Sequence, residues 1–159
     1  MRARLLPVSL SLVLLATQAE GGGGRRRVLD SILGVRIGAS SADASRRLDR
    51  LADRRPEERA EHEEQERGED RKMAWSLKAT EYKSVVLSVN DENRIVWITA
   101  FVRPGREIAF SKLGDLSVAR VSDSTAIWNV STPDGGYQLV ARGRSGKANV
   151  VSLLSFARD

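Results

Sequence analysis

The sequence has no cysteine, a single histidine and few aromatic residues. Without cysteine the chain can form no disulfide, no thiolate metal site, no thiol nucleophile and no lipidated N-terminal cysteine. Aromatic residues make up only 5% of the 159 residues, so the core must consist mainly of aliphatic side chains. A chain of this length forms one domain or two small ones.

Long apolar runs are also scarce. The apolar run from Leu5 to Ala16 is shorter than the roughly 20 residues that a bilayer-spanning helix needs. It follows Arg2 and Arg4 and leads to small residues ending at Ala19, which is the organisation of a signal peptide. We therefore expect residues 1–19 to be cleaved, a periplasmic or secreted protein, and no transmembrane segment in the mature chain. An uncleaved N-terminal anchor is the alternative.

Groups suited to catalysis are sparse. A serine nucleophile needs a base, and the only histidine, His62, lies in a charged run. No glycine-rich phosphate loop follows a predicted strand. Asp115, Asp123 and Asp134 could act in hydrolysis, but turn or capping chemistry explains each of them equally well. We expect a protein that is not an enzyme and uses no cofactor, and a carboxylate-based hydrolase is the weaker alternative.

The formal net charge is +5. Arg2 and Arg4 belong to the expected signal peptide, so this value overstates any affinity of the mature chain for nucleic acid. We expect no nucleic-acid partner. A basic envelope protein that binds anionic surfaces is an alternative function that the charge leaves open.

Three segments precede the main strands: a linker, a predicted helix and a charged insertion. Residues 20–27 have the composition of a flexible Gly/Arg linker. Ser40 with Asp43 predicts a capped helix, and its apolar positions Ala44, Leu48 and Leu51 share a helical face. The linker thus leads into a single α+β domain over residues 28–159.

A charged insertion at 53–72 interrupts this domain. Pro56 ends the preceding helix or begins a second one. Between residues 57 and 66 only Ala60 is apolar, and a helix that is polar all round buries nothing. We expect either a solvated helix or a disordered insertion.

His62 lies within this insertion. Glu58 and Glu66 share its face if the segment is helical. A metal site needs supporting residues around its ligands, and this segment has little to pack against. We therefore expect no metal site.

Residues 75–102 predict a β-hairpin. The runs 82–89 and 94–102 are rich in β-branched residues, and the polar residues 90–93 between them have turn chemistry. An even loop sorts the side chains best, and it pairs Leu87 with Val96 and Val85 with Ile98. The second run is apolar on both faces, which predicts a central strand covered on both sides.

The predicted register gives the hairpin two unlike faces. One face is aliphatic and contains Val85, Leu87, Val89, Val96, Ile98, Ala100 and Val102. The other contains Tyr82, Ser84, Val86, Ser88, Ile95, Trp97, Thr99 and Phe101. Aromatic and hydroxyl groups of this kind are common at protein interfaces, so we take Tyr82, Trp97, Thr99 and Phe101 as candidate binding residues. The alternative is that this aromatic face is the buried one.

A second hairpin follows. Turn residues at 134–136 and at Ser145-Gly146 separate three runs. Pairing about Ser145-Gly146 predicts one core face with Tyr137, Leu139, Ala141, Val150, Leu154 and Phe156, and places Arg142, Val140, Val151 and Leu153 on the other. The spacing of Tyr137 and Phe156 equals that of Tyr82 and Phe101. The halves are either degenerate helix-plus-hairpin repeats or unrelated hairpins of similar pattern.

A short motif precedes the first predicted helix. Ile37, Gly38, Ser40, Asp43 and Ala44, followed by a Trp-led antiparallel meander, resemble the β-lactamase-inhibitor-protein-like fold, which includes small outer-membrane assembly lipoproteins. Those lipoproteins carry an acylated cysteine, which this chain lacks. The resemblance implies a non-enzymatic module that acts through a sheet face.

These observations together predict an α+β fold. We expect an antiparallel sheet of about five or six strands, with one or two helices packed on one face. The expected function is that of an exported binding or assembly module, and the expected partner is another envelope protein.

Overall fold

The computed structural model describes residues 27–53, 71–133 and 135–156. The expected signal peptide, most of the charged insertion, His62 and Asp134 lie outside these residues. The described part of the chain is α+β, as predicted, and its strands form a single eight-stranded sheet in which every pair is antiparallel. The prediction of five or six strands was therefore too low.

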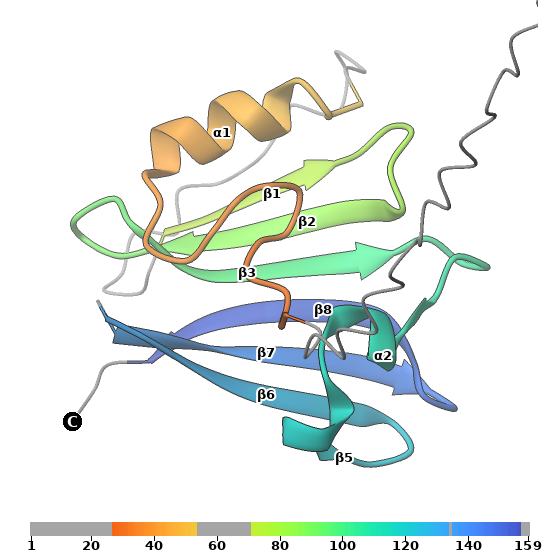
Figure 1. The fold of residues 1–159 in the computed structure, drawn as a ribbon. Helices are drawn as coiled ribbons and strands as arrows, with labels where there is room; N and C mark the ends of the chain where they lie inside the picture. Colours follow the sequence, from red (N-terminus) through yellow and green to blue (C-terminus); the bar gives the residue numbers. More distant parts are fainter. Residues whose placement is uncertain (1–26, 54–70, 134, 157–159) are drawn as a thin grey trace, which may run out of the picture.

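The elements follow one another as a helix with three long strands, then short helices with the remaining strands (Figure 1). In order they are α1 (Ser41–Asp49), β1 (Arg71–Ser76), β2 (Tyr82–Val89), β3 (Ile95–Val102), β4 (Ile108–Ala109), α2 (Phe110–Leu113), the 3-10 helix η2 (Leu116–Val118), β5 (Arg120–Val121), β6 (Thr125–Thr132), β7 (Gly135–Arg144) and β8 (Lys147–Phe156).

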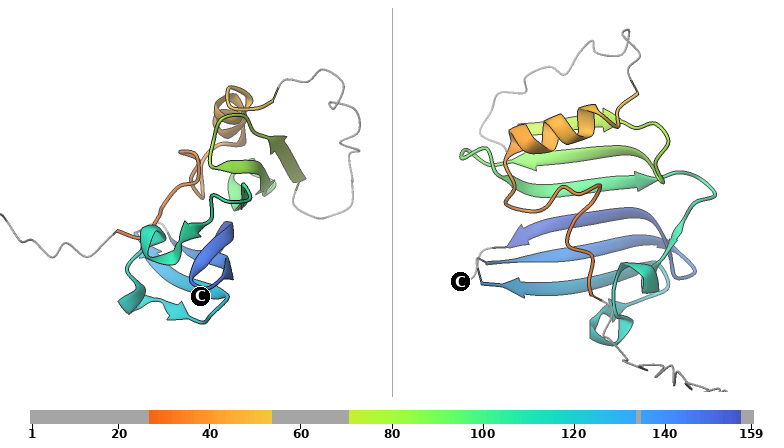
Figure 2. Two further views of the ribbon diagram at one scale, coloured as in Figure 1. Left: turned by 90° about the vertical axis from the view of Figure 1, so that its right-hand side faces the viewer. Right: turned by 45° about the horizontal axis from the view of Figure 1, so that its top comes forward.

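Two three-stranded meanders meet in the middle of the sheet. The strand order is β1-β2-β3-β8-β7-β6-β5, with β4 pairing separately with β8. β3 and β8 are the last long strands of their halves and lie against each other at the centre. The strand predicted at 94–102 is central in the sheet. The expectation that it is covered on both faces is not met by the described helices, which lie on one side of the sheet (Figure 2).

The core lies between one face of the sheet and a layer formed by α1, α2 and the segment 27–40 (Figure 2). We call this the core face. Its strand residues include Val85, Leu87, Ile98, Ala100, Ala126, Trp128, Leu139, Ala141, Val151 and Leu153, all buried. The covering layer contributes Ile32, Val35, Leu48, Phe110 and Leu113. Most of these side chains are aliphatic, as the composition required.

The segment 27–40 ties the two halves together. Near its start, the backbone N–H of Leu29 donates to the carbonyl of Leu113, at the end of α2. At its other end, Gly38 and Ala39 exchange backbone hydrogen bonds with Ile95 on β3. The segment therefore crosses both halves of the sheet and covers the seam between β3 and β8.

Helix α1 begins where predicted but ends at Asp49, so Leu51, expected on its apolar face, lies beyond it. Its cap also differs from the prediction. Ser40 occupies the N-cap position, yet its side chain makes no capping hydrogen bond. Asp43 instead pairs with Arg46 one turn further along. The backbone of this first turn is held by Ser41, whose N–H donates to the carbonyl of Asn93. A tertiary contact thus does what the capping box was predicted to do.

The hairpin β2–β3 forms, with a register shifted by two residues from the prediction. Leu87 pairs with Ile98 and Val85 with Ala100. A bulge before Val89 leaves Val96 without a partner in the ladder, so the side chain of Ile95 points into the core instead. Between this bulge and Ser84, the shift is by an even number of residues, which keeps each side chain on its predicted face.

The register of β7–β8 was wrong by one residue. The turn Ser145-Gly146 is as predicted, and both residues have positive φ, as a type I′ turn requires. A bulge between Arg142 and Gly143 then shifts the pairing. Because side chains alternate, a one-residue shift moves every β8 side chain to the other face. Leu153 faces the core, and Leu154 does not.

Candidate functional site

The sheet has a second face, opposite α1 and the segment 27–40. Residues paired across antiparallel strands share a face, and here they form three rows that run across the strands, which we call the open face. The first row is Lys72, Ser88, Trp97, Leu154, Gln138 and Asn129. The second is Ala74, Val86, Thr99, Ser152, Val140, Ile127 and Arg120. The third is Ser76, Ser84, Phe101, Val150, Arg142 and Thr125.

The three rows of the open face form a compact patch. Strands lie about 4.8 Å apart, so the six strands from β1 to β6 span about 24 Å. Three rows spaced two residues apart cover about 14 Å along the strands. Of the helices that the structure describes, none lies on this face (Figure 2).

Much of the open face is apolar. Trp97 and Phe101 project from β3 on either side of Thr99. The half-buried apolar side chains of the face are Val86, Trp97, Phe101, Ile127, Val150 and Leu154, and none of them belongs to the core cluster. Among the described residues, no helix covers them (Figure 2). Contiguous apolar side chains of this kind are typical of interaction surfaces.

Polar pairs cross the middle and one side of the open face. Thr99 Oγ1 and Ser152 Oγ lie 2.7 Å apart across the seam between β3 and β8. Thr99 is only 6% exposed. Gln138 Nε2 donates to Asn129 Oδ1 at 2.9 Å. These hydrogen bonds satisfy the polar side chains Thr99, Ser152, Gln138 and Asn129 within the sheet.

Tyr82 is the one candidate binding residue that the structure places elsewhere. It pairs with Val102, and the register shifts between Tyr82 and Ser84. The extra residue, Lys83, turns the Tyr82 side chain to the core face, where it is 3% exposed. The prediction that Tyr82 shares a face with Trp97, Thr99 and Phe101 is therefore wrong.

Sequence reasoning missed several residues of the open face. Val150, Leu154 and Phe156 were assigned to the core, and the bulge at Gly143 reverses that assignment. The ring of Phe156 extends the apolar surface over Gly136, where an added Cβ would lie 2.6 Å from it. A glycine inside a predicted strand is a signal for a bulge, so Gly143 could have revealed the reversal.

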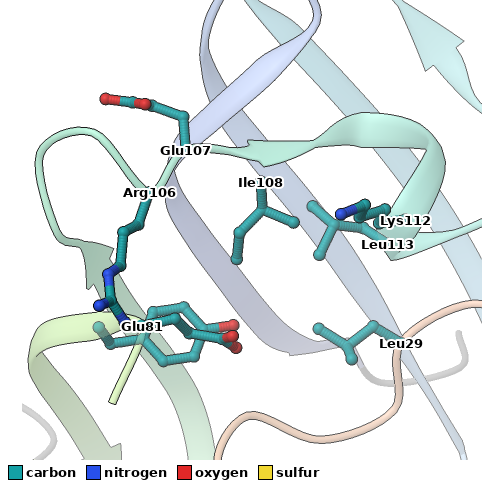
Figure 3. A pocket seen from close by; sticks show the side chains of 8 residues that line it. Leu29, Glu81, Arg106, Glu107, Ile108, Lys112 and Leu113 are labelled. Atoms are coloured by element: carbon teal, nitrogen blue, oxygen red, sulfur yellow. The ribbon is translucent and has the colours of Figure 1, made fainter. Parts of the chain in front are cut away.

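A separate cavity of about 430 Å³ lies on the core side, where the start of β2 meets α2 and the segment 27–40 (Figure 3). It is lined by Leu29, Glu81, Tyr82, Arg106, Glu107, Ile108, Lys112 and Leu113. Arg106 extends towards Glu81, whereas Glu107 points away from the hollow (Figure 3). Two cations and two carboxylates share this rim, so it favours no ligand of one charge.

The titratable groups of this cavity are explained by local structure. Burial raises the pKa of Tyr82 well above its usual range, and the nearby carboxylate of Glu81, which accepts a hydrogen bond from the tyrosine, raises it further. The pKa of Glu107 is lowered, chiefly by hydrogen bonds from its own backbone and from Gly105, whose N–H lies 3.0 Å from Oε1. Neither group is poised for proton transfer near neutral pH.

Two of the three carboxylates considered for hydrolysis can be placed. Asp115 caps η2, because its Oδ1 accepts from the backbone N–H and the hydroxyl of Ser117, at 2.9 and 2.8 Å. Asp123 lies exposed in the turn between β5 and β6. Within the described ranges, no group of three or more His, Cys, Asp or Glu side chains could hold a metal ion.

In the part of the chain that the structure covers, no helix is both long enough and apolar enough to cross a bilayer. No protein-family model matches the chain, and no curated protein or solved structure gives a significant match.

Proposed function

We propose that this protein is an exported, non-enzymatic binding or assembly module, and that it binds its partner through the open face. One observation carries the proposal. The half-buried apolar residues Val86, Trp97, Phe101, Ile127, Val150 and Leu154 gather on this one face outside the core cluster, with the rings of Trp97 and Phe101 on either side of the polar pair Thr99–Ser152. Rigid aromatic side chains surrounded by polar groups are the usual anchors of protein interfaces.

The compartment and the kind of partner rest on the sequence. The N-terminal segment 1–19 has the organisation of a signal peptide, which supports a periplasmic or secreted protein. The partner proposed is therefore another envelope protein. The resemblance to the β-lactamase-inhibitor-protein-like fold supports the same kind of function. The mirrored order of the two meanders favours an origin from two helix-plus-hairpin repeats.

A second function has its own support. Lys72, Arg120 and Arg142 lie on the open face beside its apolar residues. A basic face of this kind also suits association with anionic surfaces in the envelope.

The test is Trp97→Ser in the mature chain, used as bait in an envelope extract. Val121→Ser is the control, because Val121 is another apolar strand residue outside the core, 52% exposed, but lies at the sheet edge with a core-face register. We expect a captured protein that is lost with Trp97→Ser and kept with Val121→Ser. Both variants should melt within a few degrees of the wild type. Capture that survives Trp97→Ser, with an unchanged fold, would refute the open face as the binding site.

A further inference from the structure

The charged residues in the strands of the described sheet all have the same sign. Every charged residue inside a strand is basic: Arg71, Lys72, Lys83, Arg120, Arg142, Arg144 and Lys147. The acidic residues that the structure describes lie in α1 and in the loops instead. An overall charge of +5 does not by itself place the basic residues in the strands and the acidic residues in the helix and loops.

Four of these cations surround the apolar centre of the open face. Lys72 ends the row of Trp97 and Leu154 at β1. Arg120 ends the middle row at β5, and Arg142 lies beside Val150. Lys83 places its Nζ 6.0 Å from the centre of the Phe101 ring, on the same side.

Among the described residues, these cations are exposed and form no ion pair with a carboxylate. The ion pairs found among the described residues are Asp30–Arg36, Asp43–Arg46 and Asp53–Lys78, and none of them involves the open face. A carboxylate brought by a partner would meet them without first breaking one of these pairs.

We propose that the open face binds an acidic, amphipathic polypeptide segment. Apolar side chains of that segment pack on Trp97, Phe101 and Leu154, and its Asp or Glu residues lie against Lys72, Lys83, Arg120 and Arg142. This inference rests on the proposed function and adds the chemistry of the partner. Complementary charge at the rim steers association and rejects wrong partners, while the apolar centre supplies most of the affinity.

Other occupants fit the face less well. A second copy would bring the same cations against Lys72 and Arg142, which costs free energy when like charges meet in an interface. Nucleic-acid sites line up their cations along one groove, whereas the cations of this face lie on four different strands around its apolar residues. Membrane-binding surfaces insert protruding apolar groups, whereas Val86, Val150 and Leu154 are half-buried within the sheet.

The experiment is selection from a random peptide library displayed on phage, against the mature chain. Enriched peptides should combine apolar residues with a net negative charge. The best of them, made synthetically, should bind with an affinity that falls as salt increases, because exposed charges are screened. A single-stranded oligothymidylate and vesicles containing phosphatidylglycerol are tested in parallel as the competing occupants.

Charge reversal provides the specific variants. In Lys72→Glu/Arg142→Glu, affinity for the acidic peptides should fall by about tenfold or more, from two lost attractions and two new repulsions. Arg50→Glu is the control, because Arg50 is exposed at the C-terminus of α1, away from the open face. It changes the net charge in the same direction, by half as much as the double variant, and should leave the affinity within about twofold.

The outcomes separate this inference from the proposed function. Acidic, apolar peptides that depend on Trp97 and on the reversed cations support both. Enriched peptides that need Trp97 but are basic or uncharged keep the binding face and overturn the acidic partner. Equal weakening by Arg50→Glu, or tighter retention on the oligothymidylate or the vesicles, also overturns it. Peptides insensitive to Trp97→Ser refute the open face itself.

Discussion

Leu153 and Leu154 provide a sharp test of the register of β8. They are neighbours with the same side chain, but Leu153 is 0% exposed on the core face and Leu154 is half-buried on the open face. For Leu153→Ala, about three buried carbons at about 0.8 kcal/mol each give about 2.4 kcal/mol. The cavity left behind raises the expected loss to about 3–4 kcal/mol.

Leu154→Ala should cost far less. Its side chain is only partly removed from water, and its truncation leaves a site open to solvent rather than a closed cavity. About half of the transfer free energy, roughly 1 kcal/mol, should be lost. Urea denaturation at equilibrium measures both values, provided that the m-values of the variants agree.

The result that would refute the register is a loss in Leu154→Ala equal to or larger than that in Leu153→Ala. It would mean that β7 and β8 pair one residue out of step with the structure, with Val150, Leu154 and Phe156 in the core. The same comparison between Val150 and Val151 provides an independent check, because Val151 is fully buried and Val150 is not.

Three further predictions follow from single contacts. Gly143→Ala should destabilise the fold by more than about 2 kcal/mol, because an added Cβ would lie 1.8 Å from the carbonyl oxygen of Lys147; a urea midpoint like that of the wild type would contradict the bulge. Trp128→Phe should cost about 2–3 kcal/mol in the same assay, since it removes the 2.8 Å hydrogen bond from Nε1 to the carbonyl of Asp115 and leaves that carbonyl without this donor. Burial raises the pKa of both tyrosines, Tyr82 and Tyr137. Their contribution to the stability of the fold is therefore fully present below the unfolded pKa of about 10. It falls as the pH rises above that value, because the tyrosines of the unfolded chain lose their protons first. Tyr82→Phe should flatten that fall in urea midpoints measured at alkaline pH, and an equally steep fall would argue against the burial of Tyr82.

Local patterns in the sequence predicted the elements well. The helix at 41–49 follows from the spacing of Ala44 and Leu48. The turn at Ser145-Gly146 follows from residues that tolerate positive φ. The run 94–102 is apolar on both faces and is central in the sheet. Each of these depends on short-range sterics or on hydrophobic periodicity, which a single segment carries by itself.

The arrangement of three candidate binding residues could be predicted for the same reason, and their role in binding stays a prediction. Trp97, Thr99 and Phe101 alternate along one strand, so their common face could be read from the sequence. Tyr82 could not be placed correctly, because the bulge at Lys83 is a property of how β2 meets β3 rather than of either run alone.

Tertiary structure decided which face the described helices cover and what the other face contains. The bulge at Gly143 places Val150 and Leu154 on the open face, and a shift of one residue would have buried them instead. The gathering of Lys72, Arg120 and Arg142 around them depends on the strand order, which joins residues far apart in the chain. Hydrophobic periodicity determines that a strand has two different faces, whereas register and topology determine which faces combine, because those depend on packing between distant segments.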